Sequence, residues 1–310
     1  MNEQKPSSAR PTRLTRADFL LGSAGAFCTL ALGHCALGQP MGEKMQTRSI
    51  PSIGASLPVI GCGTWRTFDV GNTPQERDRL GEVLRVLFEA GGSVIDSSPM
   101  YGRAEGVVGD LLSATHSRDN AFIATKVWTR GDSAGIAQMQ RSMQLLRTDH
   151  IDLMQVHNLL DWRTHLATLR RWKEEGRIKY LGVTHYAASA YGELEKVMRA
   201  EKLDFVQLNY AIDDRAAEKR LLPLAVDRGI AILVNLFRTL LGRPLPDWAA
   251  DIDCRSWSQV LLKYVLSHPA VTCVIPGTSR PEHMRENGLA GKGRLPDAAL
   301  RINMVTSLGF

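Results

Sequence analysis

Four titratable side chains of different types stand near the ends of three successive apolar segments. The stretch VIDSSPMYG begins as an apolar run that ends at Asp96, and Tyr101 follows five positions later. Lys126 stands near the end of AFIATKV, and His157 near the end of DLMQVHN. Because burying charge without partners is costly, core packing alone is a poor explanation for all four together. The alternative without chemistry is an Asp96–Lys126 ion pair beside a satisfied core histidine.

These residue types suggest a proton donor. A phenol in water has a pKa of about 10, and a nearby ammonium stabilises the phenolate and lowers that pKa. We therefore predict that Lys126 makes Tyr101 a usable proton donor and that Asp96 keeps Lys126 charged and oriented. A neutral His157 would hydrogen-bond the same substrate oxygen. Such a donor, without metal-ligand spacing or a nucleophilic serine or cysteine constellation, indicates carbonyl reduction by a hydride that a cofactor must supply.

The elements that must position these residues follow a regular alternation. Short apolar runs rich in β-branched residues alternate with amphipathic runs, such as QERDRLGEVLRVLFEAGG, whose leucines and valine recur at helical spacing before a glycine stop. The predicted strands are residues 58–63, 93–98, 121–127, 152–158, 179–186, 205–210, 230–236 and 271–277.

Eight such strand–helix units predict an α/β fold, a (β/α)8 TIM barrel in a single domain. Functional groups then collect at the strand ends, because that face of a barrel carries the βα loops. A doubly wound open sheet is the alternative. It would ordinarily carry GxGxxG after its first strand, and IGCGTW does not supply that pattern.

Several segments in register resemble one known family. RSIPSIGASLPVIGCGTW, VIDSSPMYG, IATKVW, DLMQVHN, GVTHY, VQLNY and VIPGTSRPEHMREN follow the order and approximate spacing of the aldo-keto reductases, over residues 47–310. The resemblance implies a catalytic tetrad of Asp96, Tyr101, Lys126 and His157, with Tyr101 as the proton donor. It also implies a (β/α)8 barrel that binds a nicotinamide cofactor, usually NADPH, in an extended pose without a Rossmann motif.

The resemblance also carries residues to the nicotinamide end of the cofactor site. Thr184 and His185 stand at the pair that holds the nicotinamide carboxamide, where the family has serine or threonine followed by asparagine. Gln207 matches the family's amide on the next strand. Asn235 stands where an aromatic residue often stacks on the nicotinamide, so that stacking contact has no match here.

At the phosphate end, the loop in IPGTSRPEHMREN leads into a helix whose N-terminal amides can bind an anion. The family places this segment around the adenosine 2′-phosphate and the adenine, which here implies Gly277, Thr278, Ser279 and Arg280 for the phosphate and Glu286 and Asn287 for the adenine. Some members have a lysine at the position of Gly277 and an arginine at that of His283. Arg280 is therefore the remaining charge for the phosphate, and we expect NADPH, with NADH less favoured.

The substrate is expected to be a small-molecule carbonyl compound. Trp65 and Trp128 follow strand ends and are expected to line its pocket, although aromatic residues also fill cores.

A cofactor-binding regulatory subunit with little or no turnover is the alternative function. A glycosidase would need a second acid near Asp96 at a neighbouring strand end, and none stands there. GRAEGVVG is interpreted as loop and helix packing.

Residues 1–38 have the layout of a cleavable export signal, and residues 39–48 that of a flexible linker before the barrel at 49–310. Four basic residues precede the uncharged stretch FLLGSAGAFCTLALGHCALG. TRADFLL resembles the twin-arginine motif, with Arg16 present and Ala17 at the second arginine position. We expect cleavage after Gly38, export machinery as a partner and a periplasmic location. The alternatives are an uncleaved anchor helix, or a non-functional leader and a cytoplasmic protein.

The charge and cysteine content argue against other classes. The net charge of +6 is spread along the chain, without the basic and aromatic run of a nucleic-acid surface. Three cysteines follow the leader, Cys62, Cys254 and Cys273, and their spacing predicts neither a disulfide framework nor a metal site. Nothing in the sequence indicates an oligomeric state.

Overall fold

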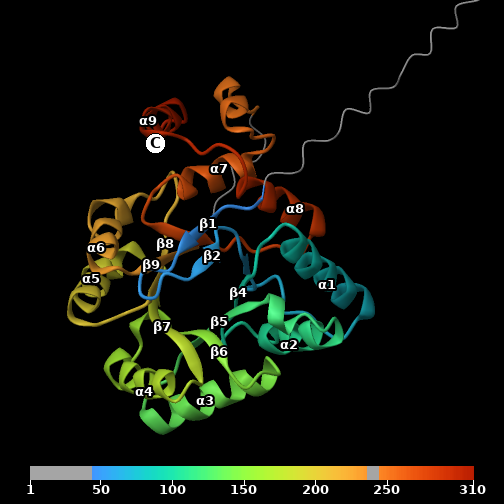
Figure 1. Ribbon diagram of the computed structural model, residues 1–310, viewed down its shortest axis with the longest axis vertical. Helices are drawn as coiled ribbons and strands as arrows, with labels where there is room; N and C mark the ends of the chain where they lie inside the picture. Colours follow the sequence, from blue (N-terminus) through green and yellow to red (C-terminus); the bar gives the residue numbers. More distant parts are fainter. Residues whose placement is uncertain (1–43, 236–243) are drawn as a thin grey trace, which may run out of the picture. The chain divides into compact units, whose positions relative to one another are not determined.

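The computed structural model describes residues 44–235 and 244–310, so the predicted leader lies outside the described residues. Eight parallel strands follow one another around a barrel in sequence order (Figure 1). This confirms the predicted (β/α)8 fold. The strands are β3 (Cys62–Gly63), β4 (Val94–Asp96), β5 (Phe122–Val127), β6 (Ile151–Val156), β7 (Ile178–His185), β8 (Phe205–Asn209), β9 (Ala231–Asn235) and β10 (Val271–Val274).

Backbone contacts join the first strand of the barrel to the last. Ile60 bridges Val274 and Gly63 bridges Gly277, both in parallel register. A Cβ atom on Gly63 would lie 2.8 Å from the carbonyl oxygen of Ile275, so only glycine allows this approach. The eight strands therefore form a nearly closed ring.

Helices follow the strands and cover the outside of the barrel (Figure 1). The amphipathic pattern explains this, because Leu80, Val83 and Leu87 of the first helix are all buried. The α-helices are α1 (Pro74–Glu89), α2 (Ala104–Ala114), α3 (Asp132–Leu145), α4 (Trp162–Glu174), α5 (Tyr191–Ala200), α6 (Leu221–Arg228), α7 (Trp257–Leu266), α8 (Pro281–Ala290) and α9 (Ala298–Ser307). Short 3₁₀ turns span Arg118–Asn120, His157–Leu159, Ala188–Ala190, Ala216–Lys219 and Asp247–Ile252.

A β-hairpin that the sequence did not predict precedes the barrel. Strand β1 (Thr47–Ser49) pairs with β2 (Ser56–Pro58) in antiparallel register. Ile50 and Leu57 are buried against the inner core of the barrel. The guanidinium of Arg48 donates to the carbonyl oxygen of His268 at 2.9 Å. Residues 47 and 48 therefore belong to a packed strand and not to a linker.

Side chains inside the barrel form an apolar layer and a polar layer, because residues two positions apart on a strand point to the same face. The apolar layer includes Val94, Ala124, Leu153, Tyr180, Phe205, Leu233 and Cys273. Two positions further along these strands stand the polar residues Asp96, Lys126, Gln155, Gln207 and Asn235. The register pairs Lys126 with Gln155, and this polar layer is the floor of the site described below.

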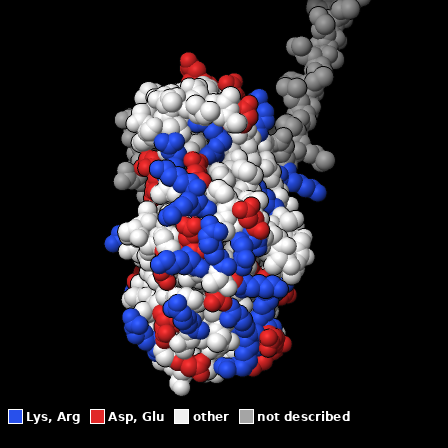
Figure 2. Space-filling model, turned by 90° about the vertical axis from the view of Figure 1, so that its left-hand side faces the viewer, with Lys and Arg blue, Asp and Glu red and all other residues white. Residues whose placement is uncertain are grey.

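On the face that Figure 2 shows, Lys and Arg side chains are interspersed with Asp and Glu.

No helix within residues 44–235 and 244–310 is long and apolar enough to cross a membrane. In the same residues no group of three or more histidine, cysteine or acidic side chains could hold a metal ion, and Cys62, Cys254 and Cys273 are buried free thiols.

Candidate active site

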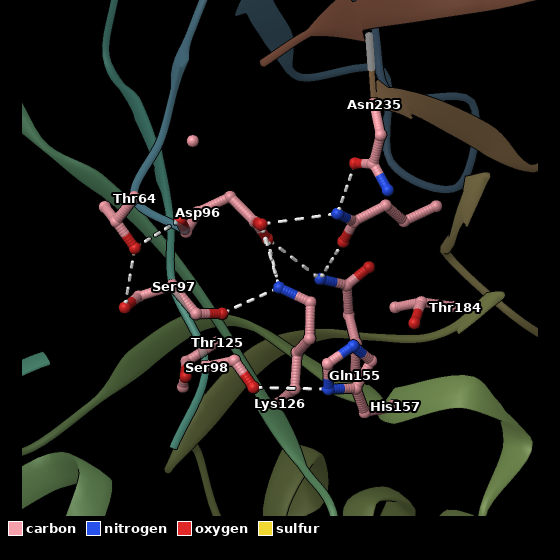
Figure 3. A network of polar contacts seen from close by, with 12 residues as sticks. Thr64, Asp96, Ser97, Ser98, Thr125, Lys126, Gln155, His157, Thr184 and Asn235 are labelled. Atoms are coloured by element: carbon pink, nitrogen blue, oxygen red, sulfur yellow. Dashed lines mark hydrogen bonds and ion pairs between the residues drawn. The ribbon is translucent and has the colours of Figure 1, made fainter. Parts of the chain in front are cut away.

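Asp96 and Lys126 form a buried ion pair at the ends of β4 and β5 (Figure 3). Lys126 Nζ donates to Asp96 Oδ1 at 2.9 Å, to Asp96 Oδ2 at 2.8 Å and to the carbonyl oxygen of Ser97 at 2.7 Å. Burial by itself lowers the pKa of Lys126, but the Asp96 carboxylate raises it, and the net shift is upward. The ammonium therefore stays charged inside the barrel.

Tyr101 lies above this ion pair, in the turn between β4 and α2. The centroid of its ring is 5.1 Å from Lys126 Nζ. Burial raises the pKa of Tyr101, Lys126 opposes that shift, Asp96 adds to it, and the net direction is upward. The predicted action of Lys126 on the pKa of Tyr101 is thus present, but desolvation is the larger effect.

His157 completes the predicted group of four. Its ring meets the ring of Tyr101 edge-on, with centroids 6.1 Å apart. Desolvation, with smaller contributions from Lys126 and His185, lowers the pKa of His157 to about 3, so the imidazole is neutral near pH 7. Ser98 Oγ lies 3.2 Å from His157 Nδ1, and a hydroxyl that donates there leaves the ring proton on Nε2.

Supporting residues that the sequence analysis did not single out surround these four. Thr64 Oγ1 donates to the Asp96 carbonyl oxygen at 3.0 Å, and it lies 2.9 Å from Ser97 Oγ, whose hydroxyl can donate to it. Gln155 is fully buried, and its Nε2 is 3.5 Å from Asp96 Oδ1. The signal for Gln155 was available, because it stands two positions before His157 and so points to the same side of its strand.

A cavity of about 1010 Å³ opens from these residues. Trp65 and Trp128 line it, as predicted, and are 46% and 41% exposed. Met100 and Tyr186 also line it and are 40% and 57% exposed. The cavity therefore has large apolar side chains near the polar residues Tyr101, His157 and Asp96.

Of the three residues predicted for the nicotinamide end of the cofactor, two line the cavity and one does not. Thr184 and Gln207 line the cavity, and Thr184 Oγ1 accepts from the backbone N–H of Asn158 at 3.2 Å. His185 does not line it. Its Nδ1 accepts from the backbone N–H of Ala187 at 3.2 Å, because the alternation along β7 turns Thr184 inward and His185 outward.

Of the residues predicted for the phosphate end of the cofactor, some line the cavity and some do not. Gly277, Thr278, Glu286 and Asn287 line the cavity, and so does His283, which was not among the predicted residues. Ser279 and Arg280 do not line it. Arg280 is exposed, and its Nε donates to the neighbouring carboxylate of Glu282 at 2.6 Å.

Comparison with known proteins assigns the chain to a family. The model of the Aldo/keto reductase family matches residues 59–242 and 235–302. Methylglyoxal reductase YeaE from Escherichia coli is 28% identical over 271 residues, which cover 83% of this chain and 93% of that protein. The NADH-specific methylglyoxal reductase of the same species is 26% identical over 312 residues, covering 78% and 92%.

Solved structures share the fold. An aldo-keto reductase from Klebsiella pneumoniae in complex with NADPH superposes with a TM-score of 0.69 at 23% identity, over 86% of this chain and 95% of that one. A reductase from Brucella melitensis gives a TM-score of 0.68 at 22% identity, over 86% and 100%. These similarities concern the fold, so they support the barrel independently of the side chains at the candidate active site.

Proposed function

Because the chain belongs to the aldo/keto reductase family, we propose that it reduces a small aldehyde or ketone to an alcohol with NADPH, using Tyr101 as the proton donor. The observation that carries this proposal is the Lys126 ammonium, fixed by Asp96 under the ring of Tyr101 and beside His157. Two relatives are named as methylglyoxal reductases, so a small α-oxoaldehyde is the first substrate to test.

The residues present fit a nicotinamide cofactor. The cavity contains polar side chains both beside Tyr101 and at α8, where Glu286 and Asn287 stand. The buried Oδ1 atom of Asn158, another lining residue, has no hydrogen-bond partner among the residues that the structure describes. We assign Thr184 and Asn158 to the carboxamide of the nicotinamide, with Gln207 beside them in the cavity wall, and Gly277, Thr278, Glu286 and Asn287 to the adenosine end. When bound, the reduced nicotinamide supplies the hydride.

The four residues at the strand ends then handle the proton. Tyr101 is a neutral phenol near pH 7, because its pKa is raised, and it donates its proton to the carbonyl oxygen of the substrate. Lys126 stabilises the phenolate that this leaves, and Asp96 holds Lys126 in place. His157, which is neutral, donates a hydrogen bond to the same oxygen and fixes its direction.

NADPH is favoured over NADH as the reductant. One solved relative is a complex with NADPH, whereas one relative is named as NADH-specific. Arg280 remains the charge that the family resemblance assigns to the 2′-phosphate, and it would have to leave Glu282 to reach that group.

A regulatory subunit with little turnover is the less favoured alternative, since all four side chains are in place and several relatives are named as reductases. The chain without residues 1–38 is mixed with NADPH and a panel of aldehydes, ketones and α-oxoaldehydes, and the absorbance of NADPH is followed. Turnover that disappears in Tyr101→Phe supports the proposal. NADPH binding without turnover of any carbonyl compound supports the regulatory alternative.

For the location, we propose export to the periplasm through a twin-arginine-like leader. Arg16 and the following ADFLL, the uncharged stretch and the small residues Ala36 and Gly38 support this proposal. The folded-protein route would let the barrel close around its cofactor before crossing the membrane. Fractionation of the native host tests it: a shortened protein in the periplasm is expected, and full-length protein confined to the cytosol would contradict it.

A further inference from the structure

Three amide side chains form a chain of hydrogen bonds inside the barrel, beginning at Asp96 (Figure 3). Gln155 Nε2 donates to Gln207 Oε1 at 3.0 Å. Gln207 Nε2 donates to Asp96 Oδ2 at 3.3 Å and to Asn235 Oδ1 at 2.6 Å. We call Gln155, Gln207 and Asn235 the amide chain. It connects the Asp96 carboxylate on β4 to the cavity wall at the end of β9.

Asp96 sets the direction of these hydrogen bonds. An ionised carboxylate only accepts, so the amide groups of Gln155 and Gln207 must turn their N–H sides toward it. Gln155 is 0% exposed and Gln207 is 2% exposed, so bulk water does not compete for these groups. Gln207 then presents its other N–H to Asn235, whose side-chain oxygen must be the acceptor.

This direction decides what the cavity offers to a ligand. Both N–H groups of Gln207 are used, by Asp96 and by Asn235. Asn235 lines the cavity and is half-buried, and its Nδ2 makes no hydrogen bond with any residue in the described part of the chain. At this wall the amide chain therefore presents the N–H donors of Asn235, held in a fixed orientation by Gln207.

We propose that Asn235 binds the carboxamide oxygen of the nicotinamide through Nδ2, and that Gln155 positions it through Gln207. The proposal rests on the proposed function, because it requires a nicotinamide cofactor. The aromatic residue expected from the family resemblance would have offered a ring to stack on. In this chain a directed hydrogen bond takes the place of that contact, and it selects for the carboxamide.

The test compares two ligands that differ in the nicotinamide. The affinities of NADPH and of 2′-phospho-ADP-ribose, which lacks the nicotinamide ring, are measured by calorimetry. Asn235→Ala loses one neutral hydrogen bond, so its affinity for NADPH is expected to be about fivefold to tenfold weaker than that of the wild type. Its affinity for 2′-phospho-ADP-ribose should be unchanged. Gln155→Leu should act in the same direction, because Gln207 Oε1 loses its donor. The double variant should bind no more weakly than Asn235→Ala.

Asn209→Ala is the matched control. Asn209 is the register partner of Asn235 on β8, but its Nδ2 donates to Asp214 at 2.7 Å, and it does not line the cavity. Its NADPH affinity should stay within about twofold of the wild type. Unchanged 2′-phospho-ADP-ribose binding by each variant shows that the barrel is folded.

The possible failures are distinguishable. Wild-type protein that does not bind NADPH would overturn the proposed function and this inference with it. Wild-type binding with equal NADPH affinity in Asn235→Ala would overturn only the role of Asn235. Strictly additive losses in the double variant would overturn the positioning role of Gln155.

Discussion

The ammonium of Lys126 lies 5.1 Å from the centre of the Tyr101 ring, and Asp96 holds it there with two hydrogen bonds of 2.9 and 2.8 Å. In the proposed reaction, the same ion pair would therefore serve two states of the phenol. Before proton transfer, burial keeps Tyr101 protonated. After transfer, the ammonium is already in place to stabilise the phenolate, without any rearrangement of the site.

Removing the phenolic hydroxyl should therefore affect the chemical step and little else. We expect Tyr101→Phe to lower kcat by about 10²- to 10⁴-fold, the range that a positioned general acid contributes. NADPH affinity should be almost unchanged, because Tyr101 is not among the residues assigned to the cofactor. Steady-state kinetics and a binding titration of the same preparation measure both effects. A variant that keeps more than about a tenth of the wild-type kcat would rule out Tyr101 as the proton donor.

His157 should make the folded protein sensitive to acid. Its pKa is lowered from 6.5 to about 3 in the folded state. As the pH falls from 6.5 toward about 3, the unfolded chain binds a proton at this histidine and the folded chain does not. The free energy of unfolding therefore decreases. His157→Gln lacks this contribution, and its unfolding free energy should fall less steeply, by at most about 1.4 kcal/mol per pH unit.

Urea unfolding at several pH values between about 4 and 7 measures that slope. His116, which is exposed in the turn after α2, provides the control. Its replacement in His116→Asn should leave the slope as in the wild type, and asparagine tolerates the positive φ of 50° at this position. Equal slopes for wild type and His157→Gln would show that the imidazole is not kept neutral by the fold.

Much of the fold could be predicted because it is encoded in local patterns. All eight predicted strands are present, since short apolar runs mark them directly. Asp96, Lys126 and His157 meet because strand ends in a barrel share one face. The hairpin around Ile50 and Leu57 was missed, since its two strands of three residues are too short for a periodic signal.

Features that depend on distant neighbours could not be predicted. The alternation along β7 decides that Thr184 faces the cavity and His185 does not, and a shift of one residue in the strand would exchange them. The net pKa shift of Tyr101 depends on how deeply other segments bury it. The ion pair of Arg280 depends on the side-chain conformation of Glu282, which the spacing does not fix.

The choice between NADPH and NADH can be tested through Arg280. If this guanidinium binds the 2′-phosphate, Arg280→Ala should raise KM for NADPH about tenfold and leave KM for NADH unchanged, because only NADPH carries that group. Glu282→Gln is the converse variant. It removes the carboxylate that holds Arg280 at 2.6 Å, and it should lower KM for NADPH. Equal changes for the two cofactors in Arg280→Ala would exclude Arg280 as the phosphate ligand.

Two glycines of α2 should respond in opposite directions to the same substitution. A Cβ atom on Gly109 would lie 2.1 Å from the carbonyl oxygen of Leu145 at the end of α3, and 2.8 Å from the Leu146 backbone. Since backbone cannot yield as a flexible side chain does, Gly109→Ala should destabilise the protein by about 1–3 kcal/mol. On Gly106, a Cβ atom would meet only the tip of the Leu145 side chain, at an ordinary 3.6 Å.

Gly106→Ala should therefore stabilise the protein by up to about 1 kcal/mol, because alanine loses less conformational entropy than glycine in a helix. The free energies of unfolding of both variants and the wild type, measured in urea, decide the matter. Since both positions are on one helix, a general effect of alanine on helix propensity would shift them in the same direction. Opposite signs would instead identify the close approach of α2 to α3 as the reason that Gly109 is required.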